Sequence, residues 1–530
     1  MVGALVTGAA VQASTSASSS CCSTTACNSN ASCACPSGSK TFFTNIPLFQ
    51  SYRPELWTSF RNDRMLSESC GWGGILDIVV YGGQSTNPDQ LAAYFLPNCK
   101  NNLLVTEALN PLPPFDNSTV LGDVMAQHFN IVTNNETFSS RICFGARHSE
   151  AGVGLHWKQG FAFNDDKSKW WYLDINLPLT WVKNRMSINE TILNNGGGVD
   201  TAASNDPAVV DMTTAFRQAG WKYGKIDCRC KNTKFGVADI ELKFGRQWWS
   251  DCCNAAGYVG VLIPTGNRAK GCYVFEPIVG HGGSAGLIFG SEGGYELWNS
   301  CNNNWHLSWA WAAQGMYLFS RCQTRSFDLK NKPWSRYQEV YANLAQATEA
   351  AALADAESPR AQYLSTPGIN VFTQCMKVTP GVWSNATTSF IVESECGFGG
   401  ELGYNLLARQ SECVDLNWVE GAALKHTEGG GFTTFIRDIT PSPYLNSSAV
   451  DCSGVSLANY SSAVIHKADL DLQSAAHPAG LVHLVYGSMG WLWDCKFPSY
   501  FTVGASYEFP YHDYSVMKRW TVWGKVGVTF

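Results

Sequence analysis

Apolar and polar residues alternate with a period of two along most of this chain, which strongly limits what it can fold into. In the segment KWWYLDINLPL, Trp171 and Ile175 fall on one side, and Asp174 and Asn176 on the other. Successive side chains of a β-strand point to opposite faces, so the segment predicts a strand with one apolar and one polar face. The same alternation occurs at residues 152–158, 236–245, 304–313, 500–509 and 519–530. With fainter segments included, we expect 12–18 strands.

Many one-sided strands build either a soluble sandwich or propeller, with the apolar rows inside, or a membrane barrel, with those rows outside. Charged residues make up only 15% of the chain and aromatic residues 13%. The polar rows consist mainly of Gly, Ser, Thr and Asn with isolated charges, which suits a confined aqueous lumen. No apolar run approaches the roughly 18 to 20 residues of a membrane-spanning helix. We therefore predict an all-β fold, a transmembrane antiparallel β-barrel with helical inserts in long loops.

The chain ends on the alternating segment RWTVWGKVGVTF. This ending resembles the terminal strand of Gram-negative outer-membrane β-barrel proteins. The resemblance implies a porin-like protein of the bacterial outer membrane, with outer-membrane lipid and the barrel-assembly machinery as partners. It also implies that the assembly signal comprises Trp520, Val522, Val526, Val528 and Phe530. The abundance of cysteine is closer to the disulfide-linked envelope barrels of chlamydia-like bacteria.

A porin-like barrel predicts a channel for small solutes. Charged residues on the polar rows would set the electric field inside this channel. The predicted pore-lining residues are His156, Lys158, Asp174, Asp239, Glu241, Lys243, Glu508, Arg519 and Lys525. Because both signs occur, we expect weak ion selectivity. We expect no enzymatic activity, metal or cofactor. The sequence HGGSAG at 281–286 contains G-x-S-x-G, but a strand follows it where a hydrolase has a helix, so we interpret it as a glycine-rich turn.

The predicted organisation has three parts. Residues 1–13 are interpreted as the remnant of a secretory signal, residues 14–40 as a flexible Ser/Cys-rich arm, and residues 41–530 as a single barrel. Helices are predicted in long loops near 85–97, 205–219 and 337–357. The last of these would cap the barrel, constrict the lumen or lie in solvent.

Twenty cysteines without the pairs of a zinc site favour disulfides in an oxidising compartment. Those on the arm are candidates for covalent self-association, which would make the protein a structural element of the envelope: Cys21, Cys22, Cys27, Cys33 and Cys35. Seven N-x-S/T sequons sustain an alternative, a disulfide-rich secreted or surface glycoprotein of soluble β type. The formal net charge of -6 argues against nucleic acid as a partner.

Overall fold

The computed structural model describes parts of one compact unit, Ser37–Phe530. The described residues are 39–45, 55–68, 73–107, 123–135, 137–164, 168–201, 206, 208–226, 232–250, 252–300, 305–330, 333–341, 365–416, 424–425, 431–432, 435–436, 470–493, 498–511 and 517–530. The predicted signal remnant and all but the last two residues of the predicted arm lie outside this part of the chain.

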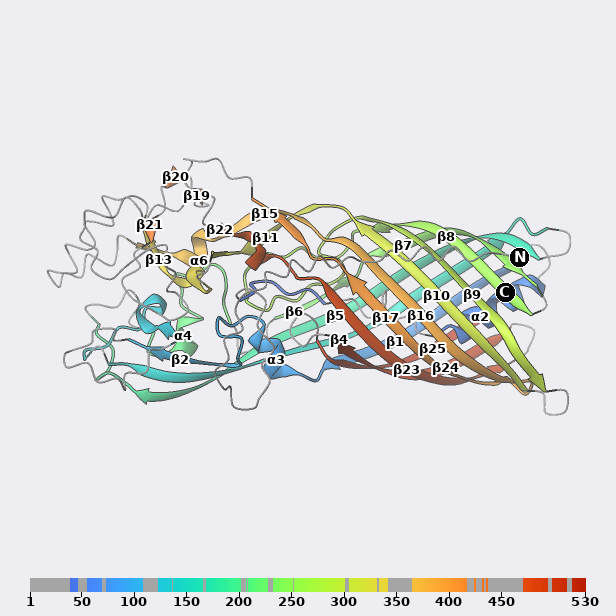
Figure 1. Cartoon of the computed structure of the whole chain (residues 1–530), viewed down its shortest axis with the longest axis horizontal. Coiled ribbons are helices and arrows are strands. Elements are labelled where there is room, and N and C mark those ends of the chain that lie inside the picture. Colours follow the sequence, from blue (N-terminus) through green and yellow to red (C-terminus); the bar gives the residue numbers. More distant parts are fainter. Residues whose placement is uncertain are drawn as a thin grey trace, which may run out of the picture. The chain divides into compact units, whose positions relative to one another are not determined.

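Twelve antiparallel strands form a closed barrel, in which each strand pairs with its neighbours on both sides. The strands lie side by side and tilted in Figure 1. In ring order they are β1 (Gly73–Ser85), β4 (Ser139–Phe161), β5 (Lys169–Asn194), β7 (Ile240–Trp249), β8 (Cys253–Ile263), β9 (Gly286–Ser300), β10 (Trp305–Leu318), β16 (Gly381–Ser394), β17 (Phe398–Arg409), β23 (Gly480–Trp493), β24 (Ser499–Pro510) and β25 (Arg519–Thr529). The predicted fold class and strand number are confirmed.

The ring closes between its first and last strands. β1 pairs with β25 from Ile75 opposite Thr529 to Ser85 opposite Arg519, and its other edge pairs with β4. The backbones of Gly74 and Phe530 also exchange hydrogen bonds of 2.7 and 2.9 Å. The wall therefore has no open edge, as a bilayer requires of strands that cross it.

The wall has its polar rows inside and its apolar rows outside. Asp77 is fully buried, whereas its neighbours Leu76 and Ile78 on the other face are 40% and 39% exposed. The tryptophans of the apolar rows also lie outside, with Trp171 at 36% and Trp309 at 38% exposure. A soluble β-sandwich would have the opposite arrangement.

Exposed aromatic side chains gather towards the two ends of the outer wall, and aliphatic side chains predominate between them. At the end where β1 begins, the aromatic residues are Trp171, Trp248, Trp298, Trp491 and Trp493. At the other end they are Trp181, Tyr317, Tyr507, Phe509 and Trp520. The exposed aliphatic residues between them include Ile78, Val153, Val259, Val392 and Val485. Two aromatic girdles around an aliphatic band are typical of barrels that cross a bilayer.

The connections between strands differ in length at the two ends of the barrel. At the end where β1 begins, β7 is joined to β8 after Trp249 and before Cys253, and β16 to β17 after Ser394 and before Phe398. We call this the short-connection end. At the long-connection end, β1 and β4 are separated by residues 86–138, and β10 and β16 by residues 319–380.

The long connections carry the remaining described elements. Strands β2 (Asn102–Thr106), β3 (Val124–Met125) and β6 (Thr233–Val237) extend the barrel sheet. The smaller sheets contain β11 (Arg321–Ser326), β15 (Thr373–Thr379) and β18 (Cys413–Asp415); β12 (Asp328–Leu329) and β22 (Leu470–Asp471); β13 (Glu339–Tyr341), β14 (Ser365–Pro367) and β21 (Phe435–Ile436); and β19 (Leu424–Lys425) and β20 (Gly431–Phe432). The short helices are α3 (Pro88–Ala93), α4 (Met212–Ala215), α6 (Gly368–Val371), η1 (Ala126–Phe129), η2 (Ser335–Tyr337) and η6 (Leu472–Ala475).

These connections have an apolar core of their own, centred on stacked and edge-to-face aromatic rings. Phe129, Phe216, Trp221, Trp334 and Tyr337 are buried there, with ring centroids of 4.9 to 6.1 Å between the contacting pairs. The barrel has its polar residues inside, so the main apolar core of the unit lies in the connections.

The predicted loop helices had different outcomes. α3 and α4 fall within the ranges 85–97 and 205–219. The prediction for 337–357 is wrong at its start, because Glu339–Tyr341 forms strand β13 in register with β14. Residues 342–357 lie outside the described part. Among the described residues, no helix has the length and apolar character needed to cross a membrane.

Candidate functional site: the barrel lumen

A helix that precedes the first strand lies inside the barrel. This helix, α2 (Trp57–Glu68), contacts inward-facing residues of several strands of the ring. Its Trp57, only 1% exposed, packs with Ala310 of β10 and Ile391 of β16. Its Leu66 packs with Ile75 and Trp170. Trp57 and Leu66 therefore anchor the helix on apolar patches of an otherwise polar wall.

The wall supplies the partners that the first turn of α2 lacks. The backbone N–H groups of Leu56 and Trp57 donate to the two carboxylate oxygens of Glu401, each at 3.0 Å. The indole N–H of Trp57 donates to Glu393. The first N–H groups of a helix have no partner within it and carry the positive end of its dipole, so a carboxylate is a favourable cap.

Further along α2, polar side chains pair with the wall. Nζ of Lys158 lies 2.5 Å from Oδ1 of Asp63 and 3.7 Å from Oε1 of Glu292. Nζ of Lys525 donates to Thr58 Oγ1 at 2.5 Å. Arg61 lies 3.8 Å from Glu393. The contacts with α2 come from β4, β16 and β25, so α2 is held from several sides.

A cavity of about 20 Å³ lies between α2 and strands β8–β10, lined by Phe60, Asp63, Asn254 and Glu292 among others. That volume suits roughly one water molecule. Solutes larger than water cannot pass through this cavity while α2 is in place.

Eight of the nine predicted pore-lining residues lie on barrel strands with their side chains in the interior. They are His156, Lys158, Asp174, Glu241, Lys243, Glu508, Arg519 and Lys525. The structure joins them in pairs and chains. His156 lies between Asp77 at 2.8 Å and Asp174 at 3.2 Å. Each ring nitrogen of His156 therefore has a carboxylate oxygen within hydrogen-bonding distance.

Two further pairs show the same arrangement. Lys243 Nζ lies 2.6 Å from Glu241 Oε2. Arg519 Nε lies 2.6 Å from Glu508, and its Nη1 lies 3.3 Å from Glu150. The mixed charges predicted from the polar rows are therefore largely paired, either within one strand or between strands.

Asp239 does not belong to the wall, and the interpretation of this residue as pore-lining is wrong. It precedes β7 with a φ of 48° and is fully buried. Its carboxylate accepts hydrogen bonds from the backbones of Thr265, Gly266 and His281. The alternation of β7 predicts an inward side chain at Asp239 only if the strand is extended by one residue, but β7 begins at Ile240. Asp239 instead holds a connecting loop.

The sequence-based prediction missed several wall carboxylates and the whole of α2. The missed carboxylates are Asp77, Glu150, Glu292, Glu296, Glu393 and Glu401. All lie on strands whose alternation is interrupted by glycine or by small residues, so the strands were faint or unrecognised. For Glu292 and Glu401, the available signal was a position between glycines on the same alternating face, Gly290 and Gly294 or Gly399 and Gly403.

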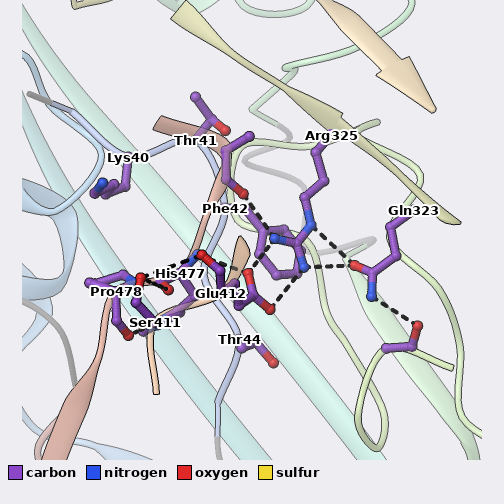
Figure 2. Close-up of polar contacts among 12 residues, drawn as sticks. Lys40, Thr41, Phe42, Thr44, Gln323, Arg325, Ser411, Glu412, His477 and Pro478 are labelled. Atoms are coloured by element: carbon purple, nitrogen blue, oxygen red, sulfur yellow. Dashed lines mark hydrogen bonds and ion pairs between the residues drawn. The ribbon is translucent and has the colours of Figure 1, made fainter. Parts of the chain in front are cut away.

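A second group of residues holds the segment before α2 at the long-connection end. We call Gln323, Arg325, Arg409, Glu412 and His477 the mouth cluster. Figure 2 shows Arg325 beside Phe42, Glu412 and Gln323. The guanidinium carbon of Arg325 lies 3.6 Å from the ring centroid of Phe42. Its nitrogens donate to both carboxylate oxygens of Glu412 and, at 2.7 and 3.1 Å, to Gln323 Oε1.

The rest of the mouth cluster reaches Thr44. The backbone N–H of His477 donates to Glu412 at 2.8 Å. Arg409 donates to Nε2 of His477 at 2.5 Å and to the carbonyl oxygen of Thr44 at 2.9 Å. Burial, together with the neighbouring Arg409 guanidinium, holds the pKa of His477 well below its usual range. The imidazole is therefore neutral and accepts the Arg409 hydrogen bond.

The predicted assembly residues lie where lipid or a partner can reach them. Trp520, Val522, Val526 and Phe530 are exposed on the outer wall and Val528 is half-buried. Trp523, which breaks the alternation of apolar residues, faces inward and packs near Tyr486. The role of Trp520, Val522, Val526, Val528 and Phe530 as an assembly signal stays a prediction.

The described cysteines are mostly exposed. Cys253 and Cys396 carry free thiols at the short-connection end, and Cys322, Cys375 and Cys413 carry free thiols on the small sheet β11–β15–β18. Cys99 is disulfide-bonded. The cross-linking candidates Cys21, Cys22, Cys27, Cys33 and Cys35 lie outside the described residues.

The HGGSAG segment lacks the geometry of a hydrolase. Ser284 is fully buried and its hydroxyl makes no hydrogen bond to the described residues. His281 Nδ1 lies 3.0 Å from Asp239. Strand β9 follows the turn directly, in agreement with the interpretation as a turn.

No protein-family model matches this chain, and no curated protein matches it. Among solved structures, an outer membrane channel from Pseudomonas putida F1 aligns with 87% of this chain and 97% of its own, at 7% identity and a TM-score of 0.36. A FadL homologue from Pseudomonas aeruginosa aligns with 93% and 98%, at 8% identity and a TM-score of 0.27. These likenesses assign no family.

Proposed function

We propose that this protein is a channel of a bacterial outer membrane that admits small solutes when α2 leaves the lumen. The observation that carries the proposal is the inverted wall. Polar and charged residues line the interior, and aromatic girdles flank an aliphatic band outside. An apolar exterior of this kind is stable in lipid, and a charged interior is stable only if water or polar groups fill it.

The dimensions explain why α2 acts as a plug. Twelve strands, spaced about 4.8 Å apart and tilted by about 40°, form a ring roughly 24 Å across between backbones. Wall side chains narrow this space, and a helix with its side chains is about 10–12 Å wide. One helix therefore fills the lumen, and its departure would leave a passage for small solutes.

Conductance across a planar bilayer tests the proposal. In the variant, residues 55–68 are replaced by a Gly/Ser linker of equal length. We expect stable conductance steps from this variant and brief, rare steps from the unmodified protein. The folded barrel is verified by a different gel migration of the unboiled and boiled protein. An electrically silent variant that still shows this migration shift would refute the channel.

A second role is favoured by the exposed thiols at the short-connection end. Cys253 and Cys396 are exposed and free, so they are accessible for disulfides with a neighbouring copy. Such links would make the protein an envelope scaffold as well as a channel. On a non-reducing gel, we expect ladders that the Cys253→Ser/Cys396→Ser variant loses and the Cys143→Ser control keeps. If the ladders persist in the double variant, Cys253 and Cys396 do not form the cross-links.

A further inference from the structure

The described lumen wall carries more acidic than basic side chains. Nine carboxylates occupy its inward positions: Asp77, Glu150, Asp174, Glu241, Glu292, Glu296, Glu393, Glu401 and Glu508. Five basic residues share these positions: Lys158, Lys243, Arg409, Arg519 and Lys525. A passage with this excess of negative charge raises the local concentration of cations.

Four of these five basic residues pair with carboxylates of the wall itself, and these pairs do not depend on α2. Lys243 pairs with Glu241, and Arg519 with Glu508. Lys525 lies 3.4 Å from Asp77, and Lys158 lies 3.7 Å from Glu292. These positive charges would stay compensated after the helix left.

Glu393 and Glu401 differ from the other carboxylates, because α2 supplies several of their positive or donor partners. Glu401 accepts the backbone N–H groups at the helix N-terminus, and Glu393 contacts the Trp57 indole and Arg61. The two carboxylates are diagonal neighbours on one face, because Glu393 lies opposite Gly399 and Glu401 opposite Ile391. Such positions are roughly 7–8 Å apart, a span that one cationic group can bridge.

A hydroxyl on the next strand adds a further oxygen to this place. Ser488 of β23 lies directly opposite Glu401 in the strand register. Its Oγ is buried, with the residue 7% exposed, and has no hydrogen-bond partner among the described residues. Carboxylate and hydroxyl oxygens are the ligands that hard cations prefer. The described residues contain no cluster of three or more His, Cys, Asp or Glu suited to a resident metal.

We infer, on the basis of the channel proposed above, that the open lumen selects cations and that Glu393, Glu401 and Ser488 form their transit site. In the closed barrel the N-terminus of α2 and the Arg61 guanidinium occupy this site as a tethered cation. The matching solutes are monovalent metal ions and organic solutes with an ammonium or guanidinium group.

The test measures the ratio of K⁺ to Cl⁻ permeability from reversal potentials in a KCl gradient. All variants carry Asp63→Asn in the full chain, which removes the ion pair between α2 and Lys158 and so favours the open state. We expect K⁺ to be preferred by roughly fivefold or more. Adding Glu393→Gln and Glu401→Gln should lower that ratio about threefold or more, because two negative charges leave the transit site.

Two controls accompany the test. Asp415→Asn removes one negative charge from an exposed position on β18, outside the barrel, and should leave the ratio unchanged. Ser488→Ala leaves the charge unchanged and should weaken competition between K⁺ and guanidinium. This inference alone is overturned if the protein conducts but prefers Cl⁻, or if substituting both glutamates leaves the ratio of K⁺ to Cl⁻ permeability unchanged. A folded protein that never conducts overturns the channel and this inference with it.

Discussion

The ion pair between Asp63 and Lys158 offers a direct measure of how firmly α2 closes the lumen. Both side chains are buried, with Nζ and Oδ1 2.5 Å apart. Asp63→Asn keeps the shape of the side chain and removes its charge. Removing one partner of a buried pair costs about 3–5 kcal/mol. Lys158 retains Glu292 at 3.7 Å, so we expect a cost below that range, about 2–3 kcal/mol.

This free energy converts into a change in channel opening. Because 1.4 kcal/mol corresponds to a factor of ten, the ratio of closed to open states should fall by about 30- to 150-fold. Single-channel recording measures that ratio as the fraction of time spent at the conducting level. Asp415→Asn, on the exposed strand β18, is the control for a change of charge alone.

A double-mutant cycle assigns the effect to the pair. If Asp63 acts through Lys158, Lys158→Met should change the opening ratio, and combining it with Asp63→Asn should add much less than the sum of the single effects. Equal closed fractions in the unmodified protein and Asp63→Asn, with the gel shift of a folded barrel in both, would refute the reasoning that this pair holds the plug.

The mouth cluster should lose stability in acid, because His477 is held neutral by burial and by Arg409. Its folded pKa lies well below 6.5. The stabilisation is therefore fully present above pH 6.5 and is lost as the pH falls from 6.5 towards the folded pKa, since only the unfolded state readily takes up the proton. Cleavage by trypsin after Lys40 should accelerate over that range, and His477→Gln should flatten the dependence. On the outer wall, Val259, at 63% exposure, should tolerate Leu, whereas Val259→Arg should lower the free energy of unfolding in lipid vesicles by about 2–4 kcal/mol, measured by urea titration. Deleting Phe530 should reduce the amount of heat-modifiable barrel in the cell envelope, and an unchanged yield would count against its role in assembly.

The wall could be predicted from sequence because its signal is local. Period-two alternation at Asp174, Glu241 and Lys243 specifies which face is polar, and the low share of charged residues specifies where that face must lie. Trp523 broke the pattern because a barrel interior tolerates an aromatic residue where another, here Tyr486, can pack near it. These features follow from neighbouring residues and from composition.

The plug could not be predicted in the same way. The sequence of α2 gives no sign that its partners are Glu401, Lys158 and Lys525, which are 90 or more residues away in the chain. The contacts of Arg325 with Phe42 and Glu412 are equally remote in sequence. Long-range pairing of charges depends on strand register and closure, which a single sequence does not display.

The seam between β1 and β25 constrains the order of events during biogenesis. Strand β25 follows the other eleven barrel strands in the chain and completes the ring by pairing with β1. Helix α2 immediately precedes β1. Helix α2 must therefore be enclosed while β1 and β25 pair, or else enter the lumen after the barrel has closed. If α2 is enclosed while the barrel closes, the wall does not have to open again afterwards. In that case the strands assemble around α2, which acts as a template for the barrel.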